Sequence, residues 1–176
     1  FYKIAEILKS GNGNHIVDIS CREEPFDYES KPSGHSLSDY VTIMRGCDNF
    51  CSYCIVPYVR GRERCRPPER IVEEINRLDQ NGRREIWLLG QNVNSYKFDS
   101  MDFPALLGYV LENTEIPRIR FLTSHPKDFS EALIERMASD KRICKGLHLP
   151  MQSGSDAVLK KMNRKYRAGE YLDKIR

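Results

Sequence analysis

The chain is organised around residues 40–54, YVTIMRGCDNFCSYC, in which a short apolar run leads into three cysteines spaced C-x3-C-x2-C. An aromatic residue stands directly before the second and the third cysteine. Thiols this close cannot pair with one another as disulfides without strain, because bridged cysteines need a particular Cα separation and side-chain direction. A short loop can instead wrap three thiolates around a metal centre, as in iron–sulfur proteins. Three ligands leave one coordination position open, which is typical of a reactive site rather than a structural one.

Strand and helix patterns alternate after the predicted strand at 40–44. Apolar runs predict further strands at 85–89, 119–122 and 146–149, and apolar stripes predict helices at 68–80, 103–111, 131–137, 156–162 and 169–176. The run at 85–89 is almost continuously apolar, as in a sheet that is buried on both faces. Asp128 to Glu131 predicts a capping box for the helix that follows. The alternation predicts an α/β fold with a parallel sheet of βα units. Four units do not close an eight-stranded barrel, so we expect an open sheet or a truncated barrel.

Residues 1–38 show a different pattern. The spacing predicts a helix at 1–9 and a strand at 15–19, and 21–38 has the composition of a linker. We therefore assign 1–38 to the tail of another domain plus a linker, and 39–176 to the α/β core. Because the chain opens with Phe1 and not with methionine, we expect it to be a segment of a longer protein.

Composition and charge narrow the class of protein. A net charge of +3 neither requires nor excludes a nucleic-acid partner. No apolar run approaches the length of a bilayer span, and the chain opens without a signal-peptide pattern, so we expect no membrane association. Six cysteines without a regular framework favour a reducing compartment and a metal role over disulfides.

A polar stretch follows each predicted strand directly. These stretches are residues 47–54, 90–96, 123–126 and 150–155. Parallel strands share one carboxyl edge, where α/β proteins bind their ligands, so the fold brings the four stretches together. Their Gln, Asn and Ser side chains offer donors and acceptors for a polar ligand. Polar loops are common after any strand, but four of them beside a cysteine loop favour a functional site.

At this point the sequence resembles a known family. The cysteine loop after the first strand is similar to the radical S-adenosylmethionine (SAM) signature. Residues 55–64, 89–96, 123–126 and 147–155, in this order, resemble the MiaB-type tRNA methylthiotransferases, and the likeness runs from about residue 39 to 176. The resemblance implies a partial TIM-like radical SAM barrel.

The resemblance also implies the cofactors and the reaction. Cys47, Cys51 and Cys54 would bind a 4Fe-4S cluster whose fourth iron is chelated by SAM. Reductive cleavage of SAM would give a 5′-deoxyadenosyl radical that takes hydrogen from C2 of an N6-isopentenyladenosine at tRNA position 37, beside the anticodon. A methylthio group is then installed there. No side chain of this chain is expected to act as a catalytic acid or base.

Contacts to SAM follow from the same resemblance. Tyr53 would pack on the adenine of SAM, or shield the cluster. Residues Gly90, Gln91 and Asn92 would contact the SAM amino group. Gln152 and Ser153 stand where the ribose or carboxylate of SAM is often bound.

The expected partners are the tRNA anticodon stem-loop, with its isopentenylated adenosine, and an electron donor such as flavodoxin or ferredoxin, in the cytoplasm. Full-length relatives carry a second 4Fe-4S cluster in an N-terminal domain and an RNA-binding TRAM domain at the C-terminus. We therefore expect this chain to carry at most the first cluster and to be inactive alone.

Other polar residues leave two interpretations open. Five arginines between Arg60 and Arg70 could bind an anion, either the phosphates of the anticodon stem or the cofactor carboxylate, or they could form internal pairs on a solvated loop. His125 and His148 are expected to be structural. Three further cysteines, Cys21, Cys65 and Cys144, are expected to be ordinary buried or linker residues.

Four alternatives to this function remain open. Two lie within the family: a methylthiotransferase that modifies an aspartate of a ribosomal protein, and one that modifies threonylcarbamoyl-adenosine in tRNA. Another is a structural zinc module with Cys47, Cys51, Cys54 and Cys65 as ligands, although its spacing departs from paired zinc ligands. The last is an electron-transfer ferredoxin, which would need a fourth thiolate.

Overall fold

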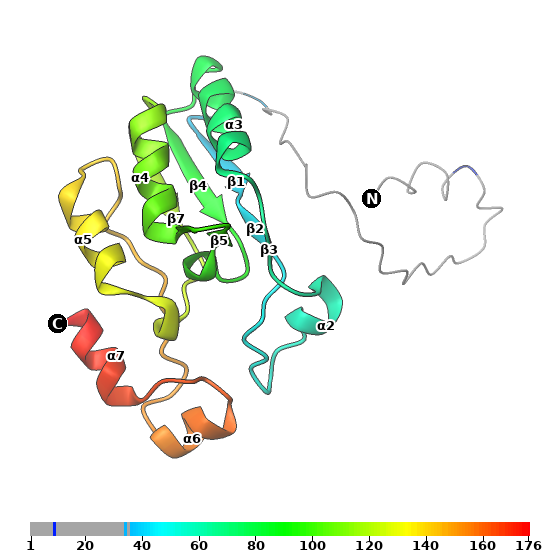
Figure 1. The fold of residues 1–176 in the computed structure, drawn as a ribbon, viewed down its shortest axis with the longest axis vertical. Coiled ribbons are helices and arrows are strands. Elements are labelled where there is room, and N and C mark those ends of the chain that lie inside the picture. The colour runs from blue at the N-terminus through cyan, green and yellow to red at the C-terminus, as the bar shows by residue number, and fades with distance from the viewer. Residues whose placement is uncertain (1–8, 10–33, 35) are drawn as a thin grey trace.

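A three-stranded parallel β-sheet forms the centre of the computed structural model (Figure 1). The structure describes residues 9, 34 and 36–176. In spatial order the strands are β1 (Ser38–Thr42), β4 (Glu85–Leu89) and β7 (Arg118–Phe121). In the middle strand, Leu88 pairs with Val41 on one side and with Phe121 on the other. The predicted parallel sheet of βα units is confirmed, and its strands end at one shared carboxyl edge.

Three longer helices follow the three strands, as predicted. They are α3 (Pro68–Gln80), α4 (Phe103–Asn113) and α5 (Glu131–Ser139). Since the strands lie side by side in chain order and crossovers are right-handed, α3 and α4 lie on the same side of the sheet. Pro68 begins α3 with a φ that suits the first turn of a helix, and the side chain of Asp102 caps α4 by accepting the Ala105 N–H at 3.0 Å.

The capping box predicted for Asp128 to Glu131 is wrong. The side chain of Ser130 caps α5 by accepting the Leu133 N–H at 3.3 Å. Asp128 instead closes a short 3-10 helix, η2 (Pro126–Asp128), and its carboxylate binds a neighbouring loop.

Shorter elements surround the carboxyl edge of the sheet. They are β2 (Met44–Arg45), α2 (Val56–Arg60), β3 (Arg64–Cys65), η1 (Val93–Ser95), β5 (Lys97–Phe98), β6 (Met101–Asp102), α6 (Asp156–Lys161) and α7 (Ala168–Ile175). The helices predicted at 156–162 and 169–176 correspond to α6 and α7. In Figure 1, α2 and α6 both lie beyond the carboxyl edge of the sheet, although they are far apart in the sequence.

The core lies between the sheet and its helices. The predicted stripe of α3 is buried, with Ile71, Ile75 and Leu78 fully enclosed. Phe103 of α4 meets Phe121 of β7 edge to face, with ring centroids 5.1 Å apart. Apolar spacing alone therefore identified the side chains that hold the helices on the sheet.

The sheet buries one face more completely than the other, contrary to the expectation of burial on both. Along β4, Ile86 and Leu88 are fully buried, whereas Trp87 is only partly covered. The guanidinium of Arg120 lies 5.0 Å from the Trp87 ring and covers it partly. The reason is that helices cover only one face of the three strands in the part of the chain that the structure describes.

The fourth predicted strand, 146–149, is wrong. The chain there runs beside β7 but forms only an isolated parallel bridge between Ile119 and Ile143. This segment hydrogen-bonds to β7 and the residues after it only near its own two ends. There the Cys144 N–H donates to the Ile119 carbonyl, and the His148 carbonyl accepts the Ser124 N–H. A strand needs consecutive ladder bonds, and here the ladder is interrupted between those ends.

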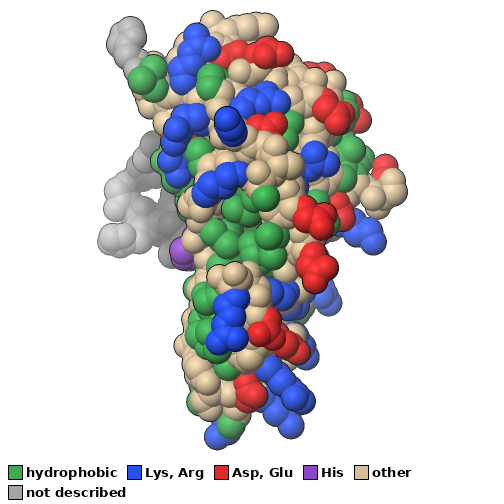
Figure 2. Space-filling view, turned by 90° about the vertical axis from the view of Figure 1, so that its left-hand side faces the viewer, with side chains coloured by type: hydrophobic (Ala, Val, Ile, Leu, Met, Phe, Trp, Pro, Cys, Tyr) green, Lys and Arg blue, Asp and Glu red, His purple; other side chains and the backbone are tan. Residues whose placement is uncertain are grey.

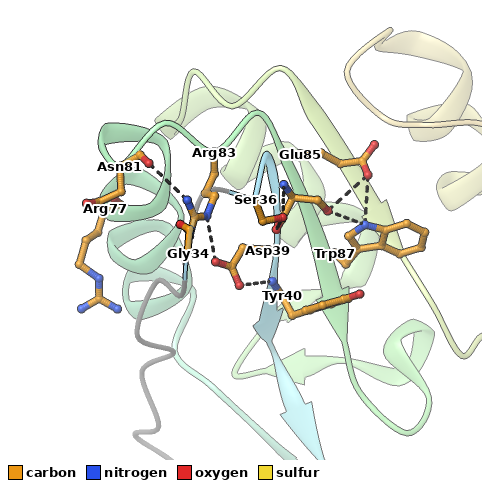
Figure 3. Close-up of polar contacts among 10 residues, drawn as sticks. Gly34, Ser36, Asp39, Tyr40, Arg77, Asn81, Arg83, Glu85 and Trp87 are labelled. Atoms are coloured by element: carbon orange, nitrogen blue, oxygen red, sulfur yellow. Dashed lines mark hydrogen bonds and ion pairs between the residues drawn. The ribbon is translucent and has the colours of Figure 1, made fainter.

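A buried ion pair closes the opposite, amino edge of the sheet (Figure 3). Nε of Arg83 donates to the Asp39 carboxylate at 3.1 Å, and its other nitrogens reach the carbonyls of Asn81 and Gly34. Only 4% of the Arg83 side chain is exposed. Arg83 thus fastens β1 and the segment before it to the turn that follows α3, far from the cysteine loop.

An apolar groove lies between α5 and α7. Figure 2 shows hydrophobic side chains gathered over the middle of that face of the molecule. The groove is lined mainly by Phe129, Ile134, Met137, Leu147 and Ile175.

The helix predicted at 1–9, the strand predicted at 15–19 and most of the linker predicted at 21–38 fall outside the described residues, so the division at residue 38 stays a prediction. Within the described part of the chain, every helix is too short or too polar to cross a bilayer.

Candidate metal and cofactor site

The cysteine loop leaves the carboxyl edge of the sheet between β2 and α2. The loop buries Cys47 and Cys51, each 8% exposed, and half-buries Cys54. All three are free thiols, as are Cys65 and Cys144. Three thiols of one short loop are thus sheltered from bulk water but not bonded to each other.

Glycine is required where the loop begins. Gly46 has a φ of 77°, and a Cβ at this position would lie 2.0 Å from the carbonyl oxygen of Arg62. The Gly46 N–H donates to Oε1 of Gln91 at 2.6 Å, and the Cys47 N–H donates to the Gly61 carbonyl at 3.2 Å. The N–H groups of Gly46 and Cys47 are therefore both held, at a close approach to Arg62 that only a glycine permits.

A second contact comes from the turn at residues 161–166, between α6 and α7. The Ser52 N–H donates to the Met162 carbonyl at 3.1 Å, and the Ser52 hydroxyl to the Lys161 carbonyl at 2.9 Å. Nδ2 of Asn163 donates to the Phe50 carbonyl at 2.9 Å. This turn, which we call the 161–166 clamp, holds the cysteine loop from its far side.

Arg164 is the centre of the clamp. Its side chain is buried, with the residue 5% exposed. One terminal nitrogen donates to Sγ of Cys51 at 3.4 Å, and the other to the Pro150 carbonyl at 3.4 Å. The guanidinium also lies 5.4 Å from the ring of Tyr166, whose hydroxyl donates to the Met151 carbonyl. Arg164 thus joins the cysteine loop to the loop at 150–155.

Asn163, Arg164 and Tyr166 are site residues that the sequence did not predict. Polar residues after a helix usually face solvent, and nothing local in the sequence connects them to a loop more than a hundred residues away. The one signal is Asn163, which has a φ of 58°: asparagine tolerates the left-handed region that a tight turn requires.

The predicted cofactor residues Gly90 and Gln91 lie beside the cysteine loop. A Cβ on Gly90 would lie 2.4 Å from Cγ of Met44, so glycine leaves room for the core there. Gln91 uses its side-chain oxygen to hold Gly46. Tyr53, the predicted partner of the SAM adenine, is 51% exposed next to Cys54.

Asn92 connects two loops of the carboxyl edge. It is 2% exposed, its Nδ2 donates to the Asp128 carboxylate at 2.7 Å, and its Oδ1 accepts the His125 N–H at 3.0 Å. Both ends of the amide are thus engaged within the protein. Gln152 is exposed with a φ of 70°, and Ser153 accepts the Ser155 N–H at 3.1 Å.

Two buried polar side chains at this edge have no hydrogen-bond partner among the described residues. They are the amide of Asn94, in η1, and the hydroxyl of Ser124, after β7. Buried polar atoms are normally paired, so these groups are suited to a polar ligand bound between the loops.

Electrostatics around the loop depend mainly on burial. Burial raises the pKa of the Cys47 thiol, while the Asn49 backbone amide offsets part of this effect. Glu63 is half-buried and accepts hydrogen bonds from the Asp48 N–H and the Ser95 hydroxyl. Burial also raises the pKa of Glu63.

The zinc alternative requires Cys65 as a ligand together with the three thiols of the cysteine loop. Among the described residues, no three His, Cys, Asp or Glu side chains are grouped so that one metal ion could bind them all. Cys65 instead accepts the Lys97 N–H at 3.3 Å and packs against the core. The thiolates of a cubane bind different irons and need not meet at one point. The structure therefore gives the zinc alternative no support.

The arginine-rich stretch divides into surface and core. The guanidinium of Arg66 is 2% exposed and binds the carboxylate of Glu74 at 2.5 Å, so Arg66 cannot contact phosphate as the first interpretation allowed. Arg62 and Arg70 form exposed pairs with Asp48 and Glu73.

The two histidines differ in their surroundings. His125 is 5% exposed, and its Nδ1 accepts the Lys127 N–H at 3.2 Å. Burial lowers its pKa from 6.5 to about 4, and the nearby Arg164 adds to this shift. His148 is exposed.

Comparison with known proteins gives the family. The model of the radical SAM superfamily matches residues 41–176. The chain is 48% identical to the tRNA-2-methylthio-N(6)-dimethylallyladenosine synthase of Treponema denticola over 94% of its own length, and 50% identical to that of Bacteroides thetaiotaomicron over 96%. It spans 40% and 38% of these relatives, respectively.

Solved structures with low sequence identity share the fold. The radical SAM methyltransferase TsrM from Kitasatospora setae, solved with a SAM analogue bound, superimposes with a TM-score of 0.63 at 17% identity, covering 78% of this chain and 27% of TsrM. The cobalamin-dependent radical enzyme OxsB gives 0.60 at 15% identity, with 78% and 21% covered. Since the family model matches most of the chain and the sheet has the same architecture, this chain belongs to the radical SAM superfamily.

Proposed function

We propose that this protein is a radical SAM methylthiotransferase that adds a methylthio group to C2 of N6-isopentenyladenosine at tRNA position 37. The observation that carries the proposal is the clamped loop of three free thiols at the carboxyl edge, in a chain about half identical to synthases named for that product. This chain covers about two fifths of those synthases, so other parts of the protein complete the activity.

Cys47, Cys51 and Cys54 would hold the 4Fe-4S cluster. The donor set suits iron, because thiolates are the usual ligands of such clusters, and the burial of Cys47 and Cys51 shelters them from water. The unpaired groups of Asn94 and Ser124 suit a polar cofactor at the same edge. When bound, the cluster and SAM supply a carbon radical that can remove hydrogen from the adenine.

The residues around the loop would position SAM and keep water out. Tyr53 is exposed beside Cys54, where an aromatic ring can stack on the SAM adenine. Gly90, Gln91 and Asn92 would line the side that faces the SAM amino group, and Gln152 and Ser153 the side that faces the ribose or carboxylate. Fixing the reacting carbon close to the adenine C–H is the main contribution that such residues make to rate.

The proposed partners are the tRNA anticodon stem-loop and an electron donor such as flavodoxin or ferredoxin, which implies a cytoplasmic location. Arg60 and Arg64 expose their side chains near the site and are suited to phosphate contacts. We propose that an N-terminal domain, whose tail lies within residues 1–38, supplies the second 4Fe-4S cluster, and that the core at 39–176 does not methylthiolate tRNA alone.

The cluster is tested by anaerobic reconstitution of the full-length protein with iron and sulfide. Replacing Cys47, Cys51 and Cys54 together by serine should remove about four irons per chain and the change in the EPR spectrum that SAM causes. The matched control is Cys65→Ser, which should keep both. Stoichiometric zinc, or an EPR spectrum that does not respond to SAM, would contradict the cluster.

The substrate is tested by nucleoside analysis of tRNA from cells that lack the gene. The methylthio derivative of isopentenyladenosine should disappear, and the unmodified isopentenyladenosine should accumulate. Loss of methylthiolated threonylcarbamoyl-adenosine, or of the methylthio group on a ribosomal protein, would identify one of the two alternatives within the family.

A further inference from the structure

Arg164 is a buried cation without a carboxylate partner among the described residues. Its guanidinium contacts the Cys51 sulfur, the Pro150 carbonyl, the Tyr166 hydroxyl and the Tyr166 ring. The other buried arginines at comparable depth have acidic partners: Arg66 binds Glu74, and Arg83 binds Asp39. Arg164 therefore differs from the arginines that only stabilise the fold.

Burial of an unpaired charge is costly, so a nearby negative charge is expected. Among the described residues that hydrogen-bond Arg164, only Cys51 has a thiol that becomes an anion when it binds iron. A guanidinium can donate to this sulfur and to the Pro150 carbonyl at once because its donors lie in a fixed planar fork. A lysine ammonium carries the same charge but lacks this fork.

We propose that Arg164 is a positioning residue that holds the Cys51 thiolate and raises the reduction potential of the cluster. The proposal rests on the proposed function, in which Cys51 binds iron. One-electron reduction, with the electron taken from an external flavodoxin- or ferredoxin-type donor, adds a negative charge to the cluster. An adjacent buried cation and an N–H···S hydrogen bond stabilise that charge, and both are known determinants of cluster potential.

The same contact would couple the potential to the loop at 150–155. Arg164 reaches the Pro150 carbonyl with its second nitrogen, and Tyr166 reaches the Met151 carbonyl from the same turn. Gln152 and Ser153, the residues proposed to bind SAM, follow directly. Movement of the loop at 150–155 would therefore change the contact between the Arg164 guanidinium and Sγ of Cys51.

The test is a redox titration of the reconstituted full-length protein, following the EPR signal that changes when SAM is added. Arg164→Met should make one-electron reduction about tenfold less favourable, which corresponds to about 59 mV. Arg164→Lys keeps the charge and should recover part of the loss. Lys165→Met is the matched control, because it removes the same charge one residue away at an exposed position and should leave the potential unchanged.

Each outcome decides the proposal. An unchanged potential in Arg164→Met, or an equal shift in Lys165→Met, would overturn it. Iron loss in both Arg164 variants with normal iron in Lys165→Met would assign Arg164 to loop folding and also overturn it. Weaker SAM binding at an unchanged potential would make Arg164 a cofactor ligand instead. If the unmodified protein assembles no cluster, the proposed function itself fails.

Discussion

Gly46 and Gln91 meet across the carboxyl edge of the sheet, where the Gly46 N–H donates to Oε1 of Gln91 at 2.6 Å. Gly46 begins the cysteine loop after β2, and Gln91 lies in the loop after β4. The neighbouring βα loop therefore sets the position of the first cysteine. Two predictions follow from the two ends of this contact.

Replacing Gly46 by alanine should destabilise the cysteine loop. The new Cβ would meet the Arg62 carbonyl oxygen at 2.0 Å, and the φ of 77° is unfavourable for any residue with a side chain. Such strain costs about 1–3 kcal/mol, and the backbone clash adds to it. Reconstituted Gly46→Ala should bind clearly less iron than the unmodified protein. The control is Gly169→Ala in α7, where a Cβ has open space, and iron binding should be normal. Full iron binding in Gly46→Ala would contradict the role of the close approach.

Replacing Gln91 by leucine removes the acceptor and leaves the Gly46 N–H without a partner. A half-buried donor left unpaired costs about 1–3 kcal/mol, so the loop should open more often and release iron faster to a chelator. Gln91→Glu keeps an oxygen in the same place and should hold iron as well as the unmodified protein does. Equal release rates in the two variants would show that the hydrogen bond does not control the loop.

The sheet could be predicted from the sequence because each strand depends on a local apolar run. The bounds of β4 were predicted correctly, and the stripe of Ile71, Ile75 and Leu78 identified the buried side of α3. The strand predicted at 146–149 failed because a strand also needs a partner that offers consecutive hydrogen bonds. Here the hydrogen bonds to β7 and the residues after it occur only near the two ends of that segment.

The site was predictable only in part for a related reason. The C-x3-C-x2-C spacing predicted a metal site at Cys47, Cys51 and Cys54, since the thiols lie in one short loop. The contact of Arg164 with Cys51 joins residues 113 positions apart, and no local pattern signals it. Likewise, the sequence does not show which of the five arginines are buried. Arg66 is buried because α3 places Glu74 beside it.

The buried pair of Arg66 and Glu74 predicts a large loss of stability when one partner is removed. Both side chains are 2% exposed, so Arg66→Met removes the guanidinium that binds a buried carboxylate. Urea unfolding should show a decrease of about 3–5 kcal/mol in the free energy of unfolding. Arg66→Met combined with Glu74→Leu should recover most of it. The matched control is Arg70→Met, which breaks the exposed pair with Glu73 and should cost less than about 1 kcal/mol. An equal loss in both single variants would contradict the prediction.

The lowered pKa of buried His125 predicts that the protein loses stability in mild acid. Burial first, and then the cations Arg164, Lys127 and Lys174, lower its pKa from 6.5 to about 4, while Asp128 opposes the shift. Between these two values the unfolded chain binds the proton and the folded chain does not, so the free energy of unfolding falls as pH decreases. The contribution of neutral His125 to the free energy of unfolding is complete above pH 6.5 and is lost as the pH falls to about 4. The total loss is about 3 kcal/mol.

The measurement is urea unfolding between pH 7.5 and 5 for three proteins. His125→Gln cannot take up the proton, so its stability should depend less on pH than that of the unmodified protein. The control is His148→Gln, because it makes the same replacement at an exposed histidine. Since Nε2 of His125 has no partner among the described residues, no hydrogen bond at that atom should be lost in His125→Gln. The same pH dependence in His125→Gln and in the unmodified protein would rule out His125 as the titrating group.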